Sequence, residues 1–150
     1  MESMITVKEL YQNPEAYAGQ SVLVGGWVRS VRASKAFGFI VVSDGSCFQT
    51  LQVVYHDTLS NFAQLSKLNV GAALLVRGVL TLTPEAKQPF ELQAESVSLE
   101  GPSTPDYPLQ KKRHSLEYLR TIPHLRPRTN TFQAVFRIRS LAAFAIHKFF

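Results

Sequence analysis

The sequence predicts a mainly β fold in which five strands form a small barrel, followed by a hinge and one C-terminal α-helix. Three observations predict it. Segments rich in Val, Ile, Phe and Leu recur between residues 21 and 99 and are separated by short polar connections. A helical segment interrupts them after the third strand. Beyond residue 130, the apolar spacing becomes that of a helix and remains so to residue 150.

Two short helices are expected within the barrel region. The first lies before Pro14, because Thr6 and Glu9 have the spacing of a capping box and Val7, Leu10 and Tyr11 could form its apolar face. The second covers residues 57–68, with Asp57 as its N-cap. Its apolar residues recur at every third position and are Leu59, Phe62, Leu65 and Leu68.

Five strands are expected around these helices, at residues 21–32, 36–44, 48–55, 72–83 and 90–99. The adjacent glycines Gly25 and Gly26 in the first strand indicate the bend or bulge that lets a sheet close on itself. Three strands, a helix and two strands is the arrangement of the OB-fold, which binds oligonucleotides through its second and third strands. An unrelated small barrel with an incidental helix is the alternative.

The last third of the chain is predicted to contain a hinge and a long helix. Residues 101–108 hold three prolines and a glycine, which is typical of a domain boundary. The helix has an apolar stripe comprising Val135, Ile138, Ala142, Ala145 and Phe149. None of the residues that usually end a helix, glycine, asparagine or proline, follows it, so we expect the chain to be the front part of a longer protein. A C-terminal helix that docks on the barrel is the alternative. The predicted division is residues 1–100, 101–130 and 131–150.

Charge separates the two halves of the chain. Residues 1–100 hold seven Lys and Arg against nine Asp and Glu, whereas residues 101–150 hold nine against two. The positive charge is concentrated in residues 111–129. This distribution excludes a protein that binds nucleic acid over a uniformly basic surface. Two interpretations of the basic segment remain, a solvated linker or a surface that faces phosphates.

Several functional classes find no support in the sequence. A single cysteine, Cys47, excludes an internal disulfide, and four scattered histidines do not predict a metal site. The N-terminus resembles neither a signal peptide nor a membrane span, so we expect a cytoplasmic protein without a membrane partner. Phosphate-loop, nucleophile-elbow and zinc-protease motifs are absent, so no catalytic residue is predicted within the chain.

The second and third strands carry residues suited to RNA. Strand alternation places Phe37 and Phe39 on one face of the second strand and Gln52 on one face of the third. With Arg29 or Arg32 on the first strand, they would supply a ring for stacking, an amide for a base edge and a cation for phosphate. A core Phe and a solvated Gln remain the alternative from pattern alone.

Two longer motifs carry a resemblance to a known family. "VGGWVRSVRASKAFGFIVVSDGS", followed by "LQVV", resembles the N-terminal anticodon-binding OB domain of the class IIb aminoacyl-tRNA synthetases. "KRHSLEYLRTIPHLRPRT" is similar to the segment that leads into the catalytic domain of the asparaginyl members, whereas aspartyl members commonly carry a different sequence there. The resemblance covers residues 7–150.

The resemblance implies roles for individual residues. Phe39 would stack on an anticodon base, Gln52 would read the central uridine and Arg32 would assist. Glu91 is the nearest match to an acidic residue that helps to read the first anticodon base in aspartyl relatives, and Trp27 would pack rather than read a base. Contacts with the tRNA backbone are expected from basic residues outside this group. These residues are Arg29, Lys35, Lys111, Lys112 and Arg113.

The resemblance also implies a larger enzyme, one that joins asparagine to tRNA(Asn) with ATP and Mg²⁺ and forms a homodimer through residues 131–150. Motifs 2 and 3 of that family and the end of motif 1 are missing, so residues 1–150 are expected to bind tRNA without catalysis and to hold no cofactor. Three alternatives remain open. They are a free-standing module for single-stranded nucleic acid, an assembly domain that uses the helix, and an aspartyl or nondiscriminating synthetase.

Overall fold

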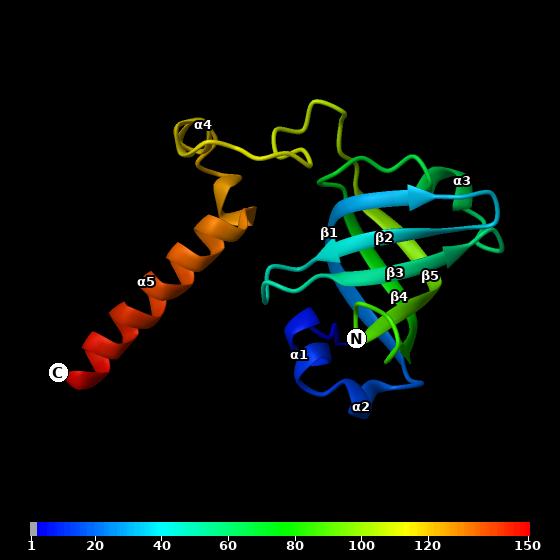
Figure 1. The fold of residues 1–150 in the computed structure, drawn as a ribbon, viewed down its shortest axis with the longest axis horizontal. Helices are drawn as coiled ribbons and strands as arrows, with labels where there is room; N and C mark the ends of the chain where they lie inside the picture. The colour runs from blue at the N-terminus through cyan, green and yellow to red at the C-terminus, as the bar shows by residue number, and fades with distance from the viewer. Residues whose placement is uncertain (1–2) are drawn as a thin grey trace. The chain divides into compact units, whose positions relative to one another are not determined.

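The structure, a computed structural model, describes residues 3–150 and contains two compact units. One unit ends at Lys111 and contains the barrel, and the other runs from Lys112 to Phe150. Figure 1 shows the elements of both units. The described chain therefore has a β-rich part and a helical part, and the helical part takes in most of the predicted hinge.

The barrel consists of five strands. They are β1 (Ser21–Ala33), β2 (Phe37–Ser43), β3 (Leu51–His56), β4 (Ala73–Leu82) and β5 (Phe90–Gly101). Their order around the closed barrel is β1-β2-β3-β5-β4, with β1 and β4 also paired. All pairs are antiparallel except β3 with β5. This arrangement confirms the predicted five-stranded barrel with a helix between the third and fourth strands.

The long strand β1 closes the barrel because it pairs with two neighbours. Its first half pairs with β4 as far as Trp27, and its second half pairs with β2 from Trp27 onward. At Gly26, beside this change of partner, a Cβ atom would lie 2.6 Å from Cγ1 of Val42 and 2.8 Å from the carbonyl oxygen of Ser43. Only glycine leaves room for this close approach, which explains the glycine predicted to mark the closure.

The core lies inside the barrel. Alternation turns Ile40 of β2 and Val53 of β3 inward, and both are fully buried together with Tyr55, Phe90 and Leu92. Among the described residues, every buried side chain is apolar or aromatic. Burial of the inward face fixes the strand register, and the same register determines which side chains face outward.

Short helices cover the ends of the barrel. Helix α1 (Val7–Gln12) places Val7 and Leu10 in the core cluster, and Oγ1 of Thr6 accepts a hydrogen bond from the Glu9 amide, as the predicted cap requires. Helix α2 (Pro14–Tyr17) follows it and was not predicted. The N-terminus of α1 is held by a carboxylate oxygen of Asp44, 2.7 Å from the amide nitrogen of Val7.

Helix α3 (Phe62–Leu65) is shorter than the sequence predicts. Asp57 is not its N-cap, because the amide of Asp57 donates to the carbonyl of Ala36 and the helix begins after Asn61. Residues 57–61 form turns rather than a helix, and apolar residues at every third position also fit such turns. The α-helix is therefore limited to the buried Leu65 and the three residues before it.

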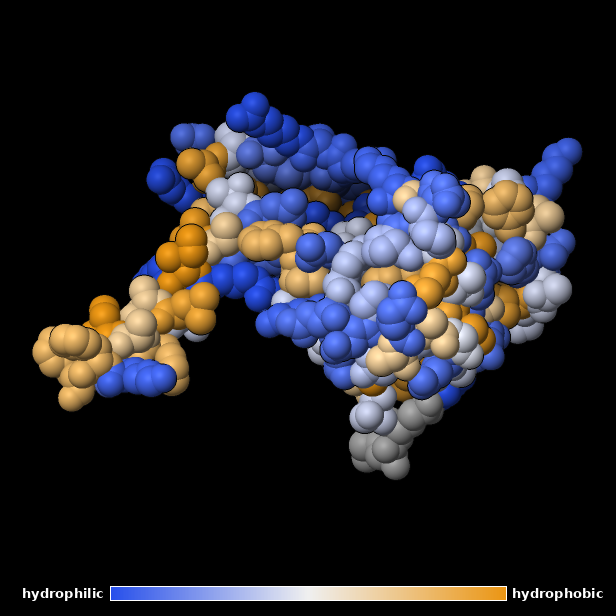
Figure 2. All heavy atoms as spheres, turned by 60° about the horizontal axis from the view of Figure 1, so that its bottom comes forward, coloured by the Kyte–Doolittle hydropathy of each residue, from blue (hydrophilic) through white to orange (hydrophobic). Residues whose placement is uncertain are grey.

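The second unit is helical. Helix α4 (Leu116–Thr121) was not predicted, and its N-cap Ser115 accepts a hydrogen bond from the Tyr118 amide. A 3₁₀ turn (Arg126–Arg128) leads to α5 (Asn130–Phe149), which confirms the predicted long helix. Exposed apolar side chains gather along α5, as Figure 2 shows, and include Val135, Ile138, Leu141, Phe144, Ile146 and Phe149. Among residues 3–150, no helix has both the length and the apolar character needed to cross a membrane.

Candidate nucleic-acid interface

Strand pairing brings four side chains together on the outer face of the barrel. They are Arg32, Phe39, Gln52 and Glu91, which we call the surface cluster. Arg32 of β1 is paired with Phe39 of β2, and Gln52 of β3 lies one step along from Val53, the residue paired with Leu92 of β5. Residues of four strands distant in sequence thus meet at one place.

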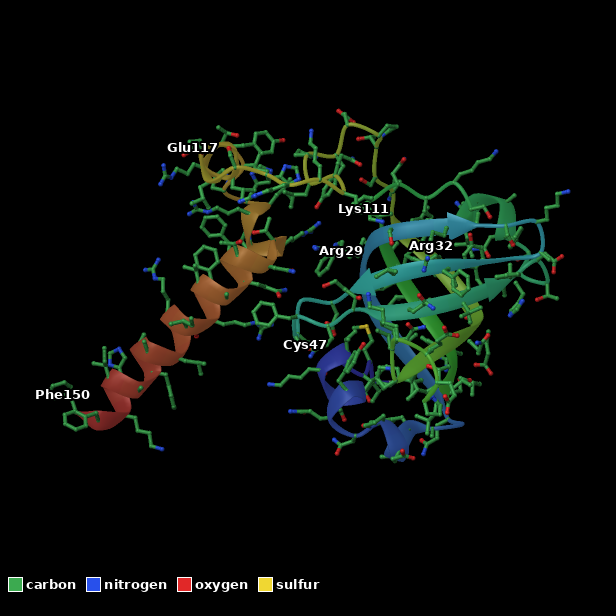
Figure 3. All side chains as sticks on the ribbon, in the orientation of Figure 1. Arg29, Arg32, Cys47, Lys111, Glu117 and Phe150 are labelled. Carbon is green, nitrogen blue, oxygen red and sulfur yellow. The ribbon has the colours of Figure 1, made fainter. Side chains whose placement is uncertain are left out.

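Arg32 and Phe39 form the first contact in the surface cluster. The guanidinium carbon of Arg32 lies 5.4 Å from the centre of the Phe39 ring, within the range of a cation–π interaction. Arg32 is exposed, and Phe39 is half-buried; the next residue of β2, Ile40, points into the barrel, so Phe39 faces outward. Figure 3 shows Arg32 projecting from β1. One face of an aromatic ring is therefore held beside a cation at the surface.

Gln52 connects the two sides of the cluster. Its Oε1 accepts a long hydrogen bond of 3.4 Å from Nη2 of Arg32, and its Nε2 donates to Oε1 of Glu91 at 2.6 Å. The parallel pairing of β3 with β5 brings Gln52 and Glu91 into contact, although these two residues are far apart in sequence. The Gln52 amide is therefore fixed, with its oxygen toward the cation and its nitrogen toward the carboxylate.

Two further residues belong to this surface and were not assigned roles from the sequence. The Phe37 ring meets the Phe39 ring edge to face, with centroids 5.5 Å apart, and Phe37 is 40% exposed. Nε2 of Gln88 donates to Oε1 of Glu91 at 2.7 Å. Alternation along β2 places Phe37 on the same face as Phe39, whereas Gln88 lies in a connection, where periodicity gives no signal.

The predicted phosphate contacts are distributed more widely. Arg29 is half-buried on β1, at the point where the register with β2 shifts between Val28 and Ser30, and such bulges redirect side chains. Lys35 is exposed in the connection between β1 and β2, and Lys111 is exposed at the end of the barrel unit. Figure 3 labels Arg29 and Lys111.

The other two predicted phosphate contacts, Lys112 and Arg113, are exposed at the start of the second unit. They belong to the unit that holds α4 and α5, whereas the surface cluster belongs to the barrel. The structure thus provides cations in both units.

Trp27, for which a packing role is predicted, lies partly at the surface. Its side chain is 37% exposed and lies outside the buried core cluster. The indole follows Gly26 at the place where β1 changes partners, so its position is set by barrel closure. It lines a shallow, mostly apolar depression together with Met4, Leu75 and neighbouring residues.

The geometry of the surface cluster suits binding. An aromatic face, an oriented amide, a guanidinium and a carboxylate lie within contact of one another, and each can bind a different part of a nucleotide. Among residues 3–150, no group of three His, Cys, Asp or Glu side chains is placed to hold a metal ion.

Comparisons with known proteins agree with this description. Residues 22–100 match the family described as the OB-fold nucleic acid binding domain. Over 97% of its length, the chain is 62% identical to an asparagine–tRNA ligase of Alkaliphilus oremlandii, of which it covers 32%. The chain thus spans about a third of the length of the curated relatives that it matches.

Solved structures share the fold. A TM-score of 0.85 relates the chain to asparaginyl-tRNA synthetase from Pyrococcus horikoshii complexed with asparaginyl-adenylate, at 20% identity over 99% of this chain and 34% of that one. Aspartyl tRNA synthetase from Entamoeba histolytica gives a TM-score of 0.79 at 19% identity, over 99% of this chain and 37% of that one. These similarities support the fold alone.

Proposed function

Because the chain belongs to the OB-fold nucleic acid binding domain family, we propose that its barrel recognises the anticodon of tRNA(Asn) as part of an asparagine–tRNA ligase. The observation that carries the proposal is the surface cluster. Side chains from four strands form one continuous series of contacts, from Phe39 through Arg32 and Gln52 to Glu91. The high identity to asparagine–tRNA ligases supports the choice of tRNA.

Each member of the surface cluster receives a role. The exposed part of the Phe39 ring stacks on an anticodon base, because every base has an aromatic face. The fixed amide of Gln52 donates to and accepts from the edge of the central uridine. Arg32 holds the ring and the amide in place, and Glu91 accepts hydrogen bonds from the first anticodon base.

Backbone contacts position the tRNA on this surface. Arg29, Lys35 and Lys111 lie in the barrel unit and Lys112 and Arg113 in the second unit, so we assign both units to phosphate binding. Such contacts add affinity and orientation but carry no sequence information. Selection of the anticodon therefore rests on the surface cluster.

The proposal extends to the whole ligase. We assign residues 1–100 to anticodon binding, 101–130 to a hinge and 131–150 to the first helix of the catalytic domain. The exposed apolar side chains of α5 support a homodimer in the whole enzyme, which we place in the cytoplasm. We assign ATP and Mg²⁺ to other parts of that enzyme, and binding and orientation of the tRNA to this chain.

Binding of RNA stem-loops tests the proposal. The wild-type chain should bind the anticodon stem-loop of tRNA(Asn) more tightly than a stem-loop with a changed central base. Phe39→Ala and Gln52→Ala should each weaken cognate binding by about 1–3 kcal/mol, through loss of stacking or of edge hydrogen bonds. Fluorescence anisotropy or calorimetric titration at fixed salt measures both effects.

Matched controls separate the site from the rest of the surface. Phe48→Ala removes another exposed ring and Gln64→Ala another exposed amide, both outside the surface cluster, and neither should change the affinity by more than about 0.5 kcal/mol. Equal affinity of the wild type for both stem-loops would favour a general single-strand binder. Unchanged binding by both cluster variants would remove the site assignment.

A further inference from the structure

We propose that Gln88 is a positioning residue, which holds the Glu91 carboxylate so that its free oxygen faces the first anticodon base. This inference rests on the proposed function. Gln88 lies in the connection between β4 and β5, outside the strands, and no role follows for it from the sequence pattern. The structure nevertheless places its amide directly on the surface cluster.

Two side-chain amides converge on one carboxylate oxygen. Oε1 of Glu91 accepts from Nε2 of Gln52 at 2.6 Å and from Nε2 of Gln88 at 2.7 Å. A carboxylate oxygen accepts about two hydrogen bonds, so these donors occupy Oε1 and leave Oε2 for a ligand. Gln88 and Gln52 thus fix both the position of the carboxylate and the oxygen that it presents.

The charge of Glu91 indicates which part of a nucleotide it can accept. The two groups that hold Oε1 are neutral amides, which orient the carboxylate without cancelling its charge. A carboxylate repels phosphate and forms strong hydrogen bonds with N–H donors. The group facing Oε2 is therefore a base edge that carries an N–H or NH₂ donor, rather than the backbone.

The connection that carries Gln88 is itself held in place. Oγ1 of Thr83 donates to the carbonyl of Gln88 at 2.9 Å, and the Thr83 amide donates to the carbonyl of Pro89 at 2.8 Å. Pro89 restricts the backbone just before β5 begins at Phe90. Gln88 is half-buried, so its amide is positioned before a ligand arrives.

Gln52 and Gln88 differ in how they are supported, and this difference makes the role of Gln88 testable. The Gln52 amide also contacts Arg32, and that contact remains when Gln88 is removed. Loss of Gln88 should therefore weaken discrimination at the first anticodon base, which Glu91 reads, more than at the central base, which Gln52 reads. A general loss of fold would weaken discrimination at both positions alike.

The experiment measures affinities of the 150-residue chain for the tRNA(Asn) anticodon stem-loop and for stem-loops changed at the first or the central base. Gln88→Ala should reduce first-base discrimination by about two- to tenfold, the value of one hydrogen bond, and central-base discrimination by less than twofold. Gln88→Glu has nearly the same shape but places a second carboxylate beside Glu91, and should reduce first-base discrimination at least as much. Gln64→Ala is the matched control and should change neither ratio.

The outcomes separate the two proposals. A wild-type chain that does not discriminate anticodons would overturn the proposed function and this inference with it. Wild-type discrimination that survives both Gln88→Ala and Gln88→Glu would overturn the inference alone, as would an equal loss at both bases. In the free chain, NMR should show a shift of the Gln52 side-chain amide signals in Gln88→Ala; unchanged signals would likewise contradict the proposed hydrogen bonding.

Discussion

At the scale of single residues, the surface of β2 depends on what lies beneath it. Gly38 sits between Phe37 and Phe39, and its missing side chain leaves space for the Tyr55 ring. Tyr55 is fully buried, and its hydroxyl is 3.3 Å from Oγ of Ser66. The two outward rings are therefore carried by a stretch of backbone that lies directly against a buried tyrosine.

Gly38→Ala should destabilise the barrel by about 1–3 kcal/mol, because the added Cβ would overlap the Tyr55 ring and the core would be overpacked. Urea denaturation followed by circular dichroism measures the change. Gly101→Ala is the matched control: its Cβ would lie an ordinary 3.5 Å from Cβ of Ala73, so its effect should stay within about 0.5 kcal/mol. Equal stability of Gly38→Ala and the wild type would show that Tyr55 moves aside without cost.

The identity of the surface residues was more accessible from the sequence than their contacts. Alternation along β2 and β3 places Phe39 and Gln52 outward because their neighbours Ile40 and Val53 are apolar and buried. Alternation cannot predict the hydrogen bond from Gln52 to Glu91, which depends on the pairing of β3 with β5. Alternation cannot predict the position of Gln88 either, because the conformation of a connection is determined by local hydrogen bonds such as those of Thr83.

At the scale of elements, the strands and α1 were predicted well, whereas the other short helices were missed or given the wrong length. Inward residues of the strands repeat with period two over many positions, so the pattern is strong. Helices α2 and α3 contain four residues each, which is too short for a helical period to appear. Ser115 and the apolar pair Leu116 and Leu119 could have indicated α4, since a serine N-cap before such spacing is a start signal.

The cap of α4 makes a pH-dependent prediction. Hydrogen bonds from its own backbone amide, and then from Ser115, hold the pKa of Glu117 below its ordinary value. Ser115→Ala should therefore raise the Glu117 pKa, while the backbone hydrogen bond keeps it below the value in an unfolded chain. Since the folded-state pKa is lowered, the support that Glu117 gives α4 is present above the unfolded pKa and is lost as pH falls through the folded one.

NMR titration of the Glu117 carboxyl carbon measures this shift. Asp106 is an internal reference, because its lowered pKa depends on Thr104 and its own backbone amide, and should be the same in both proteins. A Glu117 pKa that does not move in Ser115→Ala would exclude the hydroxyl as a contributor. A simultaneous shift of Asp106 would point to a wider change in the fold.

At the scale of the whole molecule, the two units differ in how their hydrogen bonds are protected. The strands of the barrel surround a core of fully buried side chains, and β4 is paired on both sides. Every side chain of α5 from Ile138 to Phe149 is exposed. A helix without buried contacts can open without disrupting a core, so its local stability is low.

Amide hydrogen exchange should therefore be at least about tenfold faster in residues 138–149 than in β4 of the isolated chain, a difference of about 1.4 kcal/mol in opening free energy. Mass spectrometry of peptides from the two regions measures it. The measurement is repeated over a range of chain concentrations, because association through α5 would protect the helix only at high concentration. Protection equal to that of β4 at every concentration would contradict the prediction.

The parallel pairing of β3 with β5 has a consequence for how this protein can change. Parallel neighbours cannot be joined by a tight turn, so the chain makes a long excursion between Gln52 and Glu91 before the two meet. Residues 57–72, which include α3, form the first part of that excursion. Residues 57, 58 and 60 of this excursion are exposed, whereas Leu65 and Ala72 are buried in the core, so only the exposed turns before α3 can change in length while the core stays intact. Evolution, or a protein engineer, can therefore add segments at these turns while the contact between Gln52 and Glu91 is kept.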